Sequence, residues 1–154
     1  MKRTLYFNED NHHFYGAHPA EDMSVEGLNR LVDVYASDTQ VAGVLFCVNV
    51  QRALFDSRVW EHFWDGYDAA AGEDQPALKR THGVKNHLLL RERGLDQHAI
   101  WLDRCRHHGI EGWLTMRMND CHGLKETCLH MQGKSCAVGE ADWAIHWPSQ
   151  YWCD

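Results

Sequence analysis

A nearly continuous apolar run at residues 41–50 constrains the fold more than any other stretch of the chain. It reads VAGVLFCVNV and is rich in β-branched side chains. A half-exposed strand alternates apolar and polar residues, whereas a strand of a parallel sheet that is covered on both faces is apolar along its whole length. The run therefore predicts a buried strand in a parallel sheet.

Strand and helix patterns alternate on both sides of this run. Residues 3–8 (RTLYFN) predict a first strand, and residues 24–37 predict an amphipathic helix that begins after Ser24 as its N-cap. The apolar face of that helix consists of Val25, Leu28, Leu31, Val32 and Tyr35. Further along, NHLLLRERG predicts a short helix, LDQHAIWLDRCRHHG a longer helix, and IEGWLTMRM (110–118) a third strand. Gly94 and Gly109 stand where each helix needs a left-handed last residue.

This alternation predicts an α/β fold of parallel βα units in one domain spanning residues 1–154, with helices on both faces of the sheet. Residues 51–85 read as an insertion over one end of the sheet, in which residues 57–70 fit a short helix carrying Val59, Trp60, Phe63, Trp64 and Tyr67. Residues 122–154 form an irregular segment rich in tryptophan, with no clear period.

The charge and the motif content narrow the class of partner. The net charge of −7, with histidines neutral, disfavours nucleic acid and anionic membranes as partners. No apolar run approaches the length of about 18 residues that a membrane span requires, and no signal peptide is evident, so we expect a cytoplasmic protein. Neither GxGxxG nor GxxxxGK[ST] occurs, and we expect no cofactor.

The six cysteines form no CxxC pair, so we expect buried free thiols rather than a disulfide framework. A cluster of potential zinc ligands comprises Cys121, His122, Cys128, His130 and Cys136. Its spacings lack the short pairs of a structural zinc site. We therefore predict no metal there.

Polar side chains gather where each predicted strand ends. The first strand ends at Asn8, Glu9, Asp10, His12 and His13, the second at Asn49 and Gln51, and the third at Arg117, Asn119, Asp120 and His122. In parallel α/β folds, ligands bind at the shared carboxyl end of the strands. These groups therefore predict a binding surface. The structural alternatives are that Asn119 and Asp120 cap a turn and that Arg117 pairs with Glu9 or Asp10.

The seven tryptophans suggest two roles. Trp101 and Trp113 fall in a predicted helix and strand, where a place in the core is the simplest interpretation. Trp143, Trp147 and Trp152 fall in the irregular segment, where flat rings beside polar groups are suited to stacking on sugar rings. They are equally suited to packing against a hydrophobic partner.

The segment WLTMRMNDCH (113–122) resembles uncharacterised bacterial proteins grouped with the family-ten-like glycosyl hydrolases, whose third strand runs into an Arg-Met-Asn-Asp-x-His sequence. The similarity extends to LYFNEDNHHF, GVLFCVNVQRALFDS and LDQHAIWLDRCRHHGIEGW. It implies a (β/α)8 barrel that acts on carbohydrate, with Arg117, Asn119, Asp120 and His122 positioning the substrate. A full barrel takes about 250 residues, so the resemblance implies that these are roughly its first three units and that the catalytic carboxylates belong to later strands.

Glycoside hydrolysis needs two carboxyl groups that flank the scissile bond. Within this chain, Asp120 with Glu9 or Asp10 is the candidate pair, and Asn8, Asn49, Trp143 and Trp147 join the motif residues as candidate substrate contacts. A metal-dependent hydrolase that uses His12, His13, Asp120 and His122 is one alternative. A non-enzymatic flavodoxin-like module that binds a partner through the tryptophan-rich segment is another.

Overall fold

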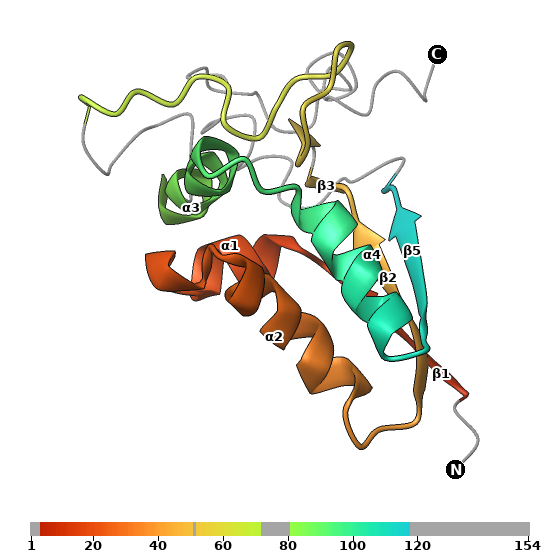
Figure 1. The fold of residues 1–154 in the computed structure, drawn as a ribbon. Coiled ribbons are helices and arrows are strands. Elements are labelled where there is room, and N and C mark those ends of the chain that lie inside the picture. The colour runs from red at the N-terminus through yellow and green to blue at the C-terminus, as the bar shows by residue number, and fades with distance from the viewer. Residues whose placement is uncertain (1–3, 51, 72–80, 118–154) are drawn as a thin grey trace, which may run out of the picture.

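The computed structural model describes residues 4–50, 52–71 and 81–117. Its centre is a three-stranded sheet of β1 (Leu5–Glu9), β2 (Val41–Cys47) and β5 (Glu111–Thr115). The strands lie in the order β1-β2-β5, and both neighbouring pairs are parallel. The predicted α/β class and the parallel sheet are confirmed (Figure 1). The apolar run at residues 41–50 supplies the central strand up to Cys47, whereas Asn49–Val50 forms the separate strand β3.

Two helices follow the first two strands and pack beside them. α2 (Val25–Ala36) connects β1 to β2, and α4 (Gln97–His107) precedes β5. Ser24 caps α2 by accepting a hydrogen bond from the Gly27 backbone N–H, and Asp96 caps α4 by accepting from the Ala99 N–H. The α2 cap is the one predicted from the sequence.

The hydrophobic core fills the layer between the sheet and these helices. Trp101 of α4 is fully buried, and its ring stacks on Phe46 of β2 with ring centroids 5.2 Å apart. Its indole N–H donates to the Leu28 carbonyl of α2 over 3.1 Å. One side chain thus joins both helices to the central strand, and the predicted core position of Trp101 is confirmed.

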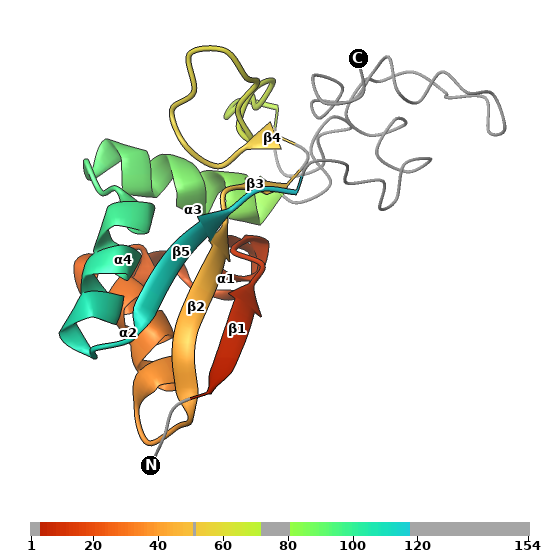
Figure 2. The same cartoon turned by 90° about the vertical axis from the view of Figure 1, so that its right-hand side faces the viewer.

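The opposite face of the sheet is not covered by any helix or strand that the structure describes (Figure 2). The expectation of helices on both faces is therefore wrong for this part of the chain. Gly112 of β5 faces Leu102 and Cys105 of α4, so the next residue, Trp113, points to the uncovered face. Trp113 is 56% exposed, which also corrects its predicted place in the core. Tyr6 lies on the same face, and its ring approaches β2 at Gly43, where a β-carbon would come within 2.8 Å of it.

Several elements escaped the sequence prediction. They are α1 (His12–Ala17), the 3₁₀ helix η1 (Ala20–Asp22), and a small antiparallel pair formed by β3 (Asn49–Val50) and β4 (Arg52–Ala53). α3 (Thr81–Glu92) starts earlier than NHLLLRERG indicates and is not shorter than α4. Gly94 and Gly109, which follow α3 and α4, adopt the predicted left-handed backbone, with φ of 66° and 63°.

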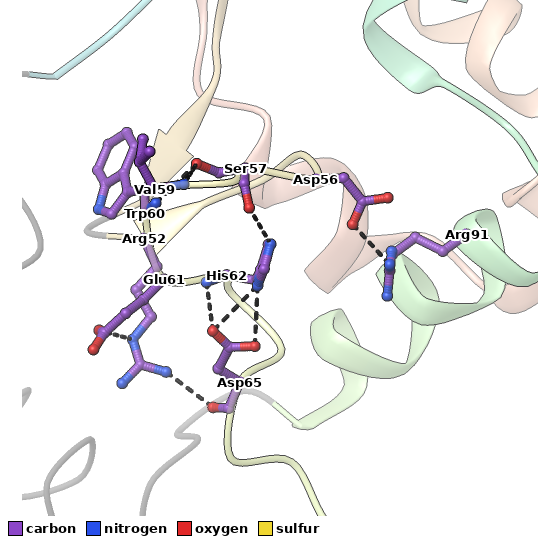
Figure 3. A network of polar contacts seen from close by, with 9 residues as sticks. All are labelled: Arg52, Asp56, Ser57, Val59, Trp60, Glu61, His62, Asp65 and Arg91. Atoms are coloured by element: carbon purple, nitrogen blue, oxygen red, sulfur yellow. Dashed lines mark hydrogen bonds and ion pairs between the residues drawn. The ribbon is translucent and has the colours of Figure 1, made fainter.

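Residues 57–70 form turns instead of the predicted short helix. Polar side chains bond nearby backbone N–H groups in these turns (Figure 3). Ser57 Oγ accepts from the Trp60 N–H, and Asp65 accepts from the His62 N–H over 2.7 Å. Gly66, at φ 85°, reverses the chain. Local hydrogen bonds such as the one from the His62 N–H to Asp65 compete with helix formation. The helix predicted from apolar spacing alone was therefore wrong.

None of the helices in the described ranges combines the length and the apolar character needed to cross a membrane.

Candidate functional site at the carboxyl ends of the strands

The ends of all three parallel strands meet in one connected group of side chains, which we call the strand-end rim: Asp10, Asn11, Asn49 and Arg117. Asp10 and Asn11 follow β1, Asn49 follows β2, and Arg117 follows β5. Because β2 lies between β1 and β5, Arg117 reaches across the end of the central strand to pair with Asp10, with Nη2 and Oδ2 2.7 Å apart. The predicted convergence of the three strand ends holds for Asp10, Asn49 and Arg117, and Asn11 joins them without having been predicted.

Asn49 fixes the position of Arg117. Its side chain is fully buried, its Nδ2 donates to the Arg117 carbonyl over 3.0 Å, and its Oδ1 accepts from the Arg117 N–H over 2.8 Å. The amide thus pairs with the backbone as a neighbouring strand would. Both of its polar atoms are used, so Asn49 serves the rim as a positioning residue and not as the predicted direct substrate contact.

Asn11 anchors the rim from the side of β1. It is fully buried, and its Nδ2 donates to the Cys47 carbonyl at the end of β2 over 2.6 Å. The same nitrogen lies 3.4 Å from Nε2 of His98. Burial lowers the pKa of His98 to about 4, so this imidazole is neutral at pH 7. The sequence offered no signal that His98 would lie here.

Two acceptor atoms of the rim remain unsatisfied. Asp10 Oδ1 and Asn11 Oδ1 are buried and have no hydrogen-bond donor within the described ranges. A buried acceptor that lacks a donor costs roughly 1–3 kcal/mol. The side chains of Asp10 and Arg117 keep 26% and 33% of their surface exposed. The rim therefore presents a fixed ion pair to solvent.

Glu9 turns away from this rim. It is 4% exposed, and its carboxyl group accepts a hydrogen bond from the Tyr35 hydroxyl of α2. Burial raises the pKa of Glu9, and the Tyr35 hydrogen bond offsets part of that effect. Of the two β1 carboxylates predicted for this surface, Asp10 lies on the rim and Glu9 lies on the helix side of the sheet. Sequence reasoning had placed Tyr35 only among the apolar positions of α2.

The remaining predicted residues have different outcomes. Asn8 is exposed on β1, and His13 is exposed on α1. Gln51, Asn119, Asp120, His122, Trp143 and Trp147 lie outside the described residues, as do four of the six cysteines. The other two, Cys47 and Cys105, are buried free thiols, as expected. The candidate pair of Asp120 with Glu9 or Asp10 therefore stays a prediction.

A metal site formed by three or more His, Cys, Asp or Glu side chains does not occur in the part of the chain that the structure describes. Two of the four residues in the metal-hydrolase alternative, Asp120 and His122, fall beyond that part. Comparison with protein-family models and with curated proteins found no match to this chain.

Proposed function

We propose that the strand-end rim binds carbohydrate, as the substrate-binding edge of a glycoside hydrolase-like protein. The observation that carries the proposal is the Asp10–Arg117 pair, fixed by Asn49 where three parallel strands end. A carboxylate accepts hydrogen bonds from hydroxyl groups, and a guanidinium donates hydrogen bonds to hydroxyl oxygens. A sugar with adjacent hydroxyl groups matches both groups at once.

We further propose that β1, β2 and β5 are the first three strands of a (β/α)8 barrel. The strands are parallel and adjacent in sequence order, and α2 and α4 lie on one face of the sheet (Figure 2). In such a barrel the helices surround the strands, and the inner face of the sheet is filled by side chains from the other strands. The exposed Tyr6 and Trp113 on the uncovered face would then contribute to the barrel interior.

Within this proposal Asp10 and Arg117 hold the substrate by its hydroxyl groups. Hydrolysis also needs an acid and a second carboxylate, about 5–5.5 Å apart for retention and about 6.5–9.5 Å apart for inversion. Asp10 is a candidate for one of them, because it is the β1 carboxylate that stays on the rim. Asp120 is the candidate partner from the third strand.

The test is a binding and turnover screen on the 154-residue chain. Oligosaccharides of xylose, glucose and N-acetylglucosamine are titrated and followed by NMR, and nitrophenyl glycosides report hydrolysis. We expect chemical-shift changes centred on Asp10, Asn49 and Arg117. Arg117→Met should weaken binding by about tenfold or more, since a charge-assisted hydrogen bond contributes roughly 1.5–3 kcal/mol.

Arg30→Met is the matched control, because Arg30 also pairs with an aspartate, Asp22, but lies on α2 away from the rim. It should leave sugar binding unchanged. A complete lack of binding and turnover across the panel would remove the proposal, and so would equal losses in the Arg117→Met and Arg30→Met variants.

A further inference from the structure

A cavity lies on the helix side of β1, behind the strand-end rim. Its volume is about 280 Å³, and Glu9 lines it together with Phe7, Phe14, His18 and Tyr35. These residues come from β1, α1, the residue after α1, and α2. We call this space the Glu9 cavity.

The carboxyl group of Glu9 has no ion-pair partner within the described ranges. Its direct contact is the hydroxyl group of Tyr35, which is uncharged. His13 and His18 act on it only through longer-range charge, and His18 is already bonded to Asp22 at 2.9 Å. Buried carboxylates in proteins are ordinarily paired with a cation. Burial raises the pKa of Glu9, and the Tyr35 hydrogen bond offsets only part of that effect.

Aromatic rings line the same cavity. Phe7 stacks on Tyr35 with ring centroids 4.2 Å apart, and the ring of Phe14 lies 4.7 Å from that of His18. Phe7 is 39% exposed, so part of its ring is open to a ligand. The faces of aromatic rings carry partial negative charge and attract organic cations, most strongly when a desolvated site holds them.

We propose that the Glu9 cavity binds an organic ammonium group, with the Glu9 carboxylate as counter-ion and the aromatic rings as walls. Cavities for drug-sized ligands measure roughly 300–1,000 Å³. A volume of about 280 Å³ suits the head group of an amine, with the rest of the ligand outside. Asp10 also lines the cavity, but Arg117 already pairs with its carboxylate, so Glu9 is the carboxylate left for a cation. This inference does not depend on carbohydrate binding at the rim.

The first test compares choline with its uncharged isostere 3,3-dimethylbutan-1-ol, which has the same shape. Each is titrated into the 154-residue chain at pH 8, where imidazole groups are in general neutral, and followed by ¹H–¹⁵N NMR. We expect saturable shifts at Phe7, Glu9 and Tyr35 with choline, and binding at least about tenfold weaker for the alcohol because it lacks the charge. Equal binding of the two ligands would overturn the proposal, as would choline shifts confined to other residues.

The second test removes the counter-ion. Glu9→Gln keeps the size of the side chain and its capacity to accept the Tyr35 hydrogen bond, and it should weaken choline binding by about tenfold or more. Glu26→Gln, which changes an exposed carboxylate in the first turn of α2, should leave binding unchanged. If Glu9→Gln does not fold, Phe7→Leu carries the test instead, because Phe7 is partly exposed and the change removes an aromatic wall. Unchanged choline affinity in the folded variant refutes the assignment.

Discussion

The rim depends on one residue, Asn49, whose side-chain amide makes the hydrogen bonds that a neighbouring strand would make. Asn49 joins β2 to the backbone of Arg117 through both atoms of its amide. A side chain that pairs with an N–H and a carbonyl of the same residue restricts that residue on both sides. The position of the Arg117 guanidinium next to Asp10 therefore depends on a fully buried residue.

The first prediction concerns this residue. Asn49→Ala leaves two backbone groups of Arg117 without partners, so we expect the free energy of unfolding to fall by about 2 kcal/mol. Urea denaturation followed by circular dichroism measures the change. Asn8→Ala is the control, because Asn8 is exposed on β1 and exposed substitutions ordinarily change stability by less than about 0.5 kcal/mol. Similar losses in both variants would contradict the role assigned to Asn49.

The sequence predicts some residues of this site and not others. The sequence places Asp10, Asn49 and Arg117 at strand ends, and the pairing of Arg117 with an acidic residue of β1 was one of its alternatives. It does not show that Glu9 faces the helices while Asp10 faces the rim. That distinction depends on where β1 ends and on the direction in which the chain leaves the strand, and both are set by packing against α1 and α2.

A polar contact between their side chains joins the two helices α2 and α4. Asp33 of α2 accepts two hydrogen bonds from Arg104 of α4, at 2.7 and 3.0 Å. Asp33 Oδ1 also lies 2.6 Å from Nε2 of His108, the residue after α4. The Arg104 hydrogen bonds are the main cause of the lowered pKa of Asp33. This polar contact complements the apolar one that Trp101 makes with both helices.

The second prediction follows from the sign of that pKa shift. The folded state lowers the pKa of Asp33, so the contribution of Asp33 to stability is present above the unfolded pKa of about 3.9 and is lost as the pH falls through the folded pKa. Asp33→Asn should therefore lower stability at pH 6 and flatten its dependence on pH below about 4. Urea midpoints measured between pH 6 and pH 2 test this. Asp103→Asn, which alters an exposed pair within α4, should leave the profile as it is.

The elements that sequence analysis identified share one property. α2, β2, α4 and β5 each carry their signal locally, as an apolar run, an apolar period or a capping residue. α1 has six residues and no side-chain N-cap, so its formation depends on contacts with α3. Residues 57–70 carry apolar residues at helical spacing, yet Ser57, Asp65 and Gly66 direct the backbone into turns. Apolar spacing alone therefore does not show whether such a segment forms a helix or turns.

Buried histidines make the stability of the whole fold depend on pH, and they do so at higher pH values than the carboxylates do. His87 is 1% exposed, and Trp64 stacks on it with ring centroids 4.7 Å apart. Burial lowers its pKa to about 3, from an ordinary value of 6.5. Below about pH 6.5 the unfolded chain binds a proton that the folded chain does not, so stability falls as the pH decreases.

The third prediction quantifies this effect. Between pH 6 and pH 4 each such histidine should cost about 1 kcal/mol of stability per pH unit. His87→Phe keeps the aromatic stacking and removes the titration, so its stability should fall less steeply over that range. His107→Gln, a change at an exposed position of α4, should follow the wild-type profile. An unchanged slope in His87→Phe would mean that His87 does not remain neutral in the folded state.

The last prediction concerns the surface of the described fold as a whole. Six of its nine exposed large hydrophobic residues belong to the edge strands β1 and β5 or follow β5 directly: Leu5, Tyr6, Phe7, Trp113, Leu114 and Met116. Apolar edge strands pair readily with other chains, and natural sheets blunt them with lysine. Leu114→Lys, at a side chain that is 50% exposed, should therefore reduce self-association measured by light scattering at increasing protein concentration.

Val34→Lys, at an exposed position of α2, adds the same charge away from the sheet and should have little effect. If Val34→Lys reduces association as much as Leu114→Lys does, net charge rather than the sheet edge controls solubility. A large loss of stability in Leu114→Lys would instead show that this side chain is covered in solution, as the barrel proposal expects for the edge where a fourth strand pairs with β5.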